Sequence, residues 1–204
     1  MDVYSRYVLP RLTHLSMGQV QLRPYRERVV GGARGRVLEI AIGSGLNLNL
    51  PFYGATVEEV IGVDSSHGML ALAERAVAAS RQKVTLLPRS AEIMPLDDRS
   101  VDTIVVTWSL CCIVRLEWTL IEARRVLKPG GQLRFVEHGL SPDLNVCKWQ
   151  ARLTPLWRRC AGGCHLNRKM DDLIRGAGFQ LAELSTGYAR GPRPMAFMYE
   201  GCAI

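Results

Sequence analysis

The sequence has no long apolar run, and this absence excludes membrane-spanning helical proteins. No part of its 204 residues approaches the ~18 consecutive apolar residues that a spanning helix needs. The opening segment, MDVYSRYVLPRLTHL, also lacks the basic and then apolar layout and the small-residue cleavage site of a secretory signal. We therefore expect a cytoplasmic protein, for which peripheral contact with a membrane stays open.

Blocks of like charge are missing too, although the chain is basic overall. Lys and Arg number 26 against 19 Asp and Glu, which gives a net charge of +7. No run of about five or six like charges occurs, so no nucleic-acid-binding tail is indicated and we expect no nucleic-acid partner. The dispersed positive charge suits an acidic substrate, an anionic membrane surface or solubility alone.

Cysteine is too sparse for a disulfide framework. The chain has 6 cysteines, of which Cys111 and Cys112 are adjacent, and we expect their thiols to be reduced. The arrangement Cys160, Cys164 and His165 offers two thiols and one imidazole, an incomplete set of zinc ligands without a distant partner pair. We predict no metal site.

Short runs of Val, Ile and Leu alternate with segments of helical periodicity through the middle of the chain. This order predicts parallel βαβ units and an α/β fold, because such strands are covered by helices on both faces. The expected strands cover residues 35–43, 58–64, 83–91, 100–108 and 132–139. Helices are expected at 65–81 and 116–131, a further helix and strand at 168–188, and a last strand at 193–204. Residues 44–54 open either a helix or a loop.

The stretch LEIAIGSGLN places two glycines, Gly43 and Gly45, at the end of the first strand. Glycine there lets a ligand approach the backbone, and a following helix would offer free N–H groups to an anion. The second strand ends in Asp64, whose carboxylate can accept both hydroxyls of a ribose. In an open α/β sheet these positions meet at the carboxyl ends of the strands, so the pattern predicts a nucleoside-containing ligand.

The spacing of these residues separates two kinds of nucleoside site. A dinucleotide site needs G-x-G-x-x-G, and Leu48 stands in the place of the third glycine, which disfavours a nicotinamide oxidoreductase. The alternative spacing, acid-x-small-x-Gly-x-Gly, is met by Glu39, Ala41, Gly43 and Gly45.

At this point the chain resembles the class I S-adenosylmethionine-dependent methyltransferases. SAEIMPLDDRSVDTIVV is similar to that family's third and fourth blocks, and RVLKPGGQLRFVEHG to its fifth-strand block. The resemblance runs from residue 36 to 137, with Ala41 standing where a glycine is usual. It implies a Rossmann-like fold with a seven-stranded, mostly parallel sheet and helices on both faces, S-adenosylmethionine as cofactor and S-adenosylhomocysteine as product.

The resemblance also implies the cofactor-binding residues. Glu39 would organise the first loop and reach the cofactor's amino group, directly or through water. Asn47 at a helix start would help to hold its carboxylate, and Asp64 would take the ribose hydroxyls. The other positions would leave room for methionine, flank the adenine or lie near the sulfonium. The implied set is Glu39, Ala41, Gly43, Gly45, Asn47, Asp64, Ser65, Met69, Ala91, Glu92, Thr107 and Trp108.

The methyl acceptor is less defined by the sequence. The fourth strand ends in TWSLCC and lacks the Asn/Asp-Pro-Pro-Tyr-like residues of enzymes that methylate exocyclic amines, so a small-molecule or lipid-like acceptor is indicated. The segment FVEHG and the insert after it are similar to a methyltransferase-like group of thiol S-methyltransferases. We favour a thiol or sulfide; a phospholipid amine, a quinone precursor and an inactive cofactor-binding partner subunit are the alternatives.

Six residues are candidates for the acceptor side. His138, at a strand end, is also the candidate catalytic base, since its ordinary pKa near ~6.5 suits proton transfer. The acceptor candidates are Tyr7, Cys112, His138, Trp149, Trp157 and Cys164.

We predict one domain over residues 1–204. It comprises an N-terminal helical lid at 1–35, a cofactor-binding core at 36–140, a substrate-side insert at 141–170 and a C-terminal helix with strands at 171–204. The lid segment fits equally a fixed packing helix or a membrane contact. The sequence does not indicate an oligomeric state.

Overall fold

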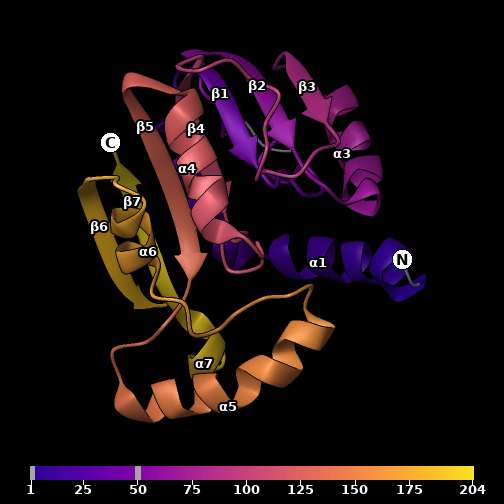
Figure 1. Cartoon of the computed structure of the whole chain (residues 1–204). Coiled ribbons are helices and arrows are strands. Elements are labelled where there is room, and N and C mark those ends of the chain that lie inside the picture. The colour runs from indigo at the N-terminus through magenta and orange to yellow at the C-terminus, as the bar shows by residue number, and fades with distance from the viewer. Residues whose placement is uncertain (1–2, 49–51) are drawn as a thin grey trace.

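The computed structural model describes residues 3–48 and 52–204, which build one 7-stranded sheet with the strand order β3-β2-β1-β4-β5-β7-β6 (Figure 1). Neighbouring strands from β3 to β5 run parallel, and β7 runs antiparallel to both β5 and β6. The strands are β1 (Gly35–Ile40), β2 (Val57–Val63), β3 (Val84–Leu87), β4 (Val101–Thr107), β5 (Leu127–His138), β6 (Leu181–Tyr188) and β7 (Phe197–Ala203). This sheet confirms the predicted α/β, mostly parallel fold.

Helices cover both faces of the sheet, as the absence of strict alternation in the strands predicted. On one face α2 and α3 pack with Val37 and Val105, and on the other face α4 and α6 pack with Leu38 and Ile104. The helices are α1 (Leu9–Met17), α2 (Arg23–Val30), α3 (His67–Ala79), α4 (Leu116–Val126), α5 (Leu144–Cys160), α6 (Met170–Gly176) and α7 (Arg193–Ala196). A π-helical turn, Tyr4–Val8, precedes α1, and a 3-10 turn, Val20–Leu22, follows it.

Of the two forms expected for the connection from β1 to β2, a helix or a loop, the described residues show the loop. The described residues of this connection, 41–48 and 52–56, form turns. The next helix in the chain, α3, comes only after β2. Ala41, Gly43 and Gly45 all have positive φ, which is incompatible with a right-handed helix. Asn47 therefore does not begin a helix in the described chain, and its amide turns toward Glu39 instead. Residues 49–51 lie outside the described residues.

The N-terminal segment lies across the carboxyl ends of the parallel strands (Figure 1). The phenol of Tyr4 donates a hydrogen bond to the carbonyl of Cys160, at the end of α5, over 2.7 Å. At the other side Gly68, near the start of α3, packs so closely on the Arg6 carbonyl that a Cβ would come within 2.5 Å of it. The segment thus bridges α3 and α5.

The region expected as an insert, 141–170, contains α5, which begins where Asp143 accepts the N–H groups of Asn145 and Val146. Such a side-chain cap satisfies donors that the first helical turn leaves free. Among the described helices, none is both long and apolar enough to cross a membrane.

Candidate functional site

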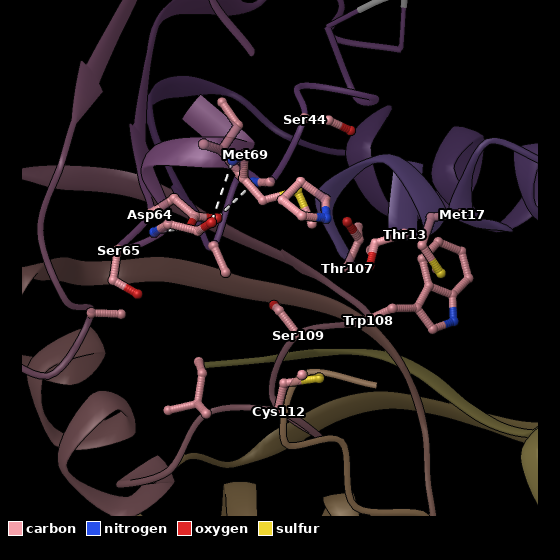
Figure 2. Close-up of a pocket in the computed structure, with 18 of the residues that line it drawn as sticks. Thr13, Met17, Ser44, Asp64, Ser65, Met69, Thr107, Trp108, Ser109 and Cys112 are labelled. Atoms are coloured by element: carbon pink, nitrogen blue, oxygen red, sulfur yellow. Dashed lines mark hydrogen bonds between the residues drawn. The ribbon is translucent and has the colours of Figure 1, made fainter. Parts of the chain in front are cut away.

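A cavity of about 470 Å³ lies at the carboxyl ends of β1, β2 and β4 (Figure 2). The turn after β1 and the ends of β2 and β4 form its inner wall, α1 forms a second wall, and the turn after α5 reaches its rim. Ten of the implied cofactor residues line it: Ala41, Gly43, Asn47, Asp64, Ser65, Met69, Ala91, Glu92, Thr107 and Trp108.

Asp64 is held in the cavity wall by two backbone donors. Its Oδ2 accepts the N–H of Gly43 over 2.9 Å, and its Oδ1 accepts the N–H of Ser66 over 2.8 Å (Figure 2). Burial raises the pKa of this carboxyl and the backbone donors oppose that rise. The carboxylate therefore has a fixed orientation at the end of β2, where it can accept hydroxyl donors from a ligand.

Glu39 organises the turn after β1, as expected, but it is not among the residues that line the cavity. Its side chain is only 2% exposed and accepts hydrogen bonds from Asn47 Nδ2 over 2.8 Å and from the Tyr53 hydroxyl over 2.5 Å. Burial raises the pKa of Glu39 to about 7, although these two donors and the Arg26 charge oppose the rise. Glu39 thus positions Asn47 without lining the cavity itself. No pattern in the sequence identified Tyr53 as a partner of Glu39.

Asn47 is oriented so that one polar atom stays free. Its Nδ2 donates to Glu39 and, over 3.1 Å, to the Thr107 hydroxyl. Its Oδ1 is buried and has no hydrogen-bond partner among the described residues. Since buried polar atoms are nearly always paired, this acceptor indicates a place for a donor such as a cationic amino group. The contact of Asn47 with the cofactor's carboxylate stays a prediction.

The two glycines of the turn have different surroundings. Gly43 has φ +60° and lines the cavity, where a Cβ would meet no atom nearer than 3.8 Å. Gly45 has φ +73° and faces α3, where a Cβ would lie 2.8 Å from that of Ala76. Gly45 therefore allows α3 to pack on the turn and does not line the cavity, which corrects its predicted role.

Trp108 and Arg26 form the wall at the tip of β4. The Arg26 guanidinium lies 4.7 Å from the Trp108 ring centroid and is 4% exposed, and both residues line the cavity. Burial lowers the pKa of Arg26 to about 10, with Glu39 opposing, so the side chain stays cationic at neutral pH. Trp108 has φ +50°, a strained conformation typical of functional turns. No sequence pattern had singled out Arg26.

Helix α1 contributes the wall opposite the strand ends. Leu9, Pro10, Thr13 and Met17 line the cavity, and His14 Nδ1 lies 2.7 Å from the hydroxyl of Ser44 in the turn after β1. The predicted acceptor residue Tyr7 is 48% exposed and does not line it. The helix periodicity turns Tyr7 away from the cavity, which the sequence could not show.

Most of the other acceptor candidates also lie outside the cavity. Cys112 lines it, whereas Trp149, on α5, is 55% exposed and points elsewhere. Trp157 donates its indole N–H to Cys164 Sγ over 3.3 Å, beside the cavity and not in it. Of the six acceptor candidates, Cys112 is the one that lines the described cavity.

His138, the candidate catalytic base, also lies outside the cavity. Its Nε2 lies 3.0 Å from Cys164 Sγ, and it is not among the residues that line the cavity. Burial lowers its pKa, but Cys164 and the Glu137 charge together more than offset this, so the pKa of His138 lies above its ordinary value. The neighbouring Glu137 accepts the N–H groups of Ser109 and Leu110 and so fixes the loop after β4.

Comparison with known proteins finds methyltransferases, the family whose implied cofactor residues mostly line the cavity. A family described as a methyltransferase domain matches residues 38–135. The chain is 31% identical over 190 residues to thiol S-methyltransferase TMT1B of Rattus norvegicus, covering 89% of this chain and 77% of the relative. It is 33% identical over 143 residues to a phosphatidylethanolamine N-methyltransferase of Cereibacter sphaeroides, covering 68% of this chain and 69% of the relative.

A solved structure extends the likeness to the whole fold. The chain aligns with a S-adenosylmethionine-dependent methyltransferase of Thermotoga maritima at a TM-score of 0.67 and 23% identity, covering 98% of this chain and 97% of that one.

Proposed function

Because this chain belongs to the class I S-adenosylmethionine-dependent methyltransferases, we propose that its acceptor is a small apolar thiol or sulfide. The methyl group would pass to the acceptor sulfur as the bond between the methyl carbon and the cofactor's sulfonium breaks, leaving S-adenosylhomocysteine. The cationic sulfonium supplies the electrophilic methyl group, and the protein's part is to hold donor and acceptor in line in a dry pocket.

The cavity fits this cofactor at three points. Asp64 offers a fixed carboxylate to the ribose hydroxyls, and the bare Gly43 lets the ligand lie against the turn. The unpaired Oδ1 of Asn47 offers an acceptor to the cofactor's amino group. Ser65, Met69, Ala91 and Glu92 line the part of the cavity on the β2 side, where an adenine would lie.

The charge at the acceptor end supports a thiol. Arg26 is the basic side chain that lines the described cavity, and its guanidinium lies 4.7 Å from the ring centroid of Trp108, which was expected near the sulfonium. A free thiol has a pKa near ~8.5, and a cation close by favours its thiolate. The same cation disfavours an ammonium, which is the resting form of a phospholipid amine.

The absence of a free base in the described cavity wall supports the same acceptor. His138 contacts Cys164, and the two acids that line the cavity, Asp64 and Glu92, lie at the expected nucleoside end. Methylation of a quinone ring carbon must remove a proton from that carbon, which needs a base. A thiolate has already lost its proton, so it needs none.

The extent of the relatives adds to this argument. The match to the thiol S-methyltransferase covers 89% of the chain, whereas that to the phospholipid enzyme covers 68%. The longer match supports a thiol acceptor. A phospholipid amine remains the second candidate because of the relative that bears that name.

The test is a panel of acceptors with one alkyl chain and different head atoms. The thiol, thioether, alcohol and amine of that chain, and phosphatidylethanolamine vesicles, are each incubated with methyl-labelled S-adenosylmethionine. We expect methylation of the thiol in the absence of vesicles and none of the amine. Labelling confined to the vesicle amine would contradict the proposal and support the phospholipid alternative.

A further inference from the structure

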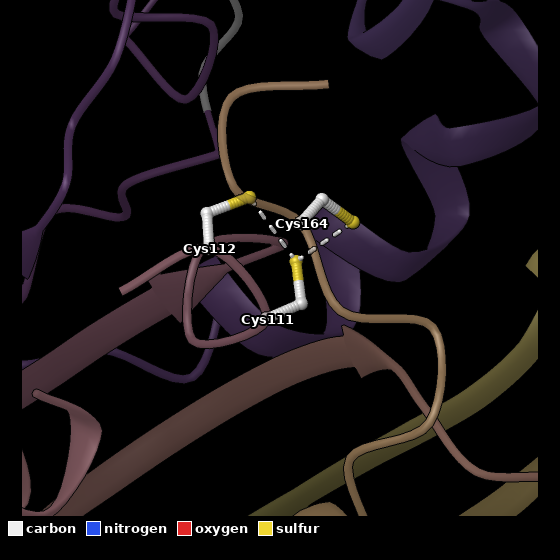
Figure 3. Close-up of side chains that lie close together, drawn as sticks. All are labelled: Cys111, Cys112 and Cys164. Carbon is white, nitrogen blue, oxygen red and sulfur yellow. Dashed lines mark hydrogen bonds between the residues drawn. The ribbon is translucent and has the colours of Figure 1, made fainter. Parts of the chain in front are cut away.

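Three cysteines from two distant parts of the chain bring their sulfur atoms together beside the cavity. Cys111 and Cys112 follow β4, and Cys164 follows α5 (Figure 3). The Sγ of Cys111 lies 3.5 Å from that of Cys112 and 3.7 Å from that of Cys164. All three atoms lie within 4.8 Å of one another. We call these three residues the thiol cluster.

The separations in the thiol cluster are those of ligands around one ion. Zinc binds thiolates at ~2.3 Å in a tetrahedral arrangement, which places two thiolates about 3.8 Å apart. A disulfide requires sulfur atoms ~2.05 Å apart, much closer than any pair in the cluster. The three thiols are therefore free in this structure, at separations that suit three ligands of a soft cation.

The two loops that carry the thiol cluster are held together by their surroundings. The N–H of His165 donates to the Cys111 carbonyl over 2.9 Å, which joins the loop after α5 to the loop after β4. The Arg168 guanidinium donates to the carbonyls of Leu110 and Ile113, on either side of the cysteine pair. The ligands are thus prepositioned, and the arginine places a positive charge beside a group that would be anionic.

Cys164 also has partners that would orient it as a ligand. His138 Nε2 lies 3.0 Å from its Sγ, and the Trp157 indole N–H donates to the same atom over 3.3 Å. Groups in this position around a metal fix the direction of its ligands and their basicity.

We propose that Cys111, Cys112 and Cys164 bind one zinc ion as thiolates, with His138 positioning Cys164. Each thiol that is protonated beforehand releases its proton to solvent on binding. Three protein ligands leave the fourth tetrahedral position to water or another small ligand, an arrangement found in catalytic zinc sites. Cys112 lines the cavity while Cys111 and Cys164 are buried, so the fourth position lies on the cavity side.

The sequence pattern considered for a metal, Cys160 with Cys164 and His165, is not this site. Cys160 is exposed, and of these three residues only Cys164 belongs to the thiol cluster. The other two ligands come from the adjacent pair, which lies about fifty residues earlier in the chain.

The experiment measures metal directly and does not depend on methyl transfer. Zinc content is determined in the purified full chain by mass spectrometry, and the metal-free protein is titrated with Co²⁺ and Zn²⁺ against a competing chelator. We expect one zinc ion per chain, and with Co²⁺ the thiolate-to-metal absorption of a tetrahedral site.

Variants assign the ligands. Cys111→Ser and Cys164→Ser should each weaken zinc binding by at least ~100-fold, and His138→Ala by about 10- to 100-fold. Cys202→Ser is the matched control, because Cys202 is also buried but lies in β7, outside the thiol cluster. It should bind zinc as the natural protein does.

S-adenosylhomocysteine binding serves as the check that each variant is folded. The proposal is overturned if the natural protein fails to bind zinc at micromolar concentration while its thiols react freely. It is equally overturned if freshly purified protein holds a disulfide between Cys111 and Cys164, or if a folded Cys111→Ser variant keeps its zinc. None of these outcomes affects the proposed methyl acceptor, which the acceptor panel tests separately.

Discussion

Glu39 influences the cavity through its neighbours and not by facing it. Its carboxyl group accepts the Nδ2–H of Asn47, whose Oδ1 is buried and has no partner among the described residues, and it also accepts the hydroxyl of Tyr53. The sequence pattern located this acid correctly but could not show its direction. Strand residues alternate between faces, and the acid lies on the face that the turn after β1 covers.

The raised pKa of Glu39 makes stability depend on pH. The folded protein holds the proton up to about pH 7, while the unfolded chain releases it near 4.5. The folded state therefore binds more protons between these values, so the free energy of unfolding falls as pH rises through them. In Glu39→Gln, which cannot titrate, we expect this slope to be shallower by about 1.4 kcal/mol per pH unit.

Urea unfolding at several pH values measures that slope. Glutamine has nearly the same shape as glutamate, so the comparison isolates the titration. An identical pH dependence in the natural protein and the variant would show that Glu39 is not the group responsible.

Arg26 is predicted to act on the ionisation of the acceptor. Its guanidinium lies in the cavity wall beside Trp108, so its loss removes the charge that favours a thiolate. In Arg26→Gln the pH of half-maximal thiol methylation should rise by about one unit, and the rates should converge at high pH. Arg26→Lys keeps the charge and should leave the midpoint nearly unchanged. A midpoint that does not move in the glutamine variant would remove Arg26 from this role.

Among the structural elements, the turn after β1 contains a strained backbone position next to the cavity. Ala41 has φ +51°, in the left-handed region, where the family's usual glycine would be unstrained. Gly43 and Gly45 follow in the same region, and this run of positive φ values ends β1 without starting a helix.

Two substitutions in this turn should have opposite effects on stability. Ala41→Gly relieves the strain and should raise the free energy of unfolding by up to about 1 kcal/mol. Gly45→Ala should lower it by about 1–3 kcal/mol, because its Cβ would lie 2.8 Å from that of Ala76. Denaturant unfolding of both variants checks the pair, and a fall in stability for Ala41→Gly would contradict the account of the turn.

The strands were predictable because runs such as TIVV in β4 are buried on both faces of a parallel sheet. Most of the cavity's inner wall was also predictable, since its residues lie at strand ends whose meeting place the topology determines. The residues around the methyl acceptor could not be predicted in this way. Its candidates lie in helices and irregular loops, where the direction of Tyr7 or His138 depends on packing that the sequence does not reveal.

At the scale of the whole molecule, the sheet order places the ends of β1, β2 and β4 side by side, and the N-terminal segment covers them. This segment contacts α3 at one side and the end of α5 at the other. The cavity is therefore completed by parts of the chain outside the core that the methyltransferase-domain family matches.

The central claim, that this cavity holds S-adenosylmethionine through Asp64, is tested most directly by calorimetric titration with S-adenosylhomocysteine. We predict micromolar binding to the natural protein and binding at least ~100-fold weaker in Asp64→Ala, because two hydrogen bonds to a charged group are lost. Asp64→Asn should lie between them. Equal binding by folded Asp64→Ala, or no binding by the natural protein, would contradict the assignment of the cavity.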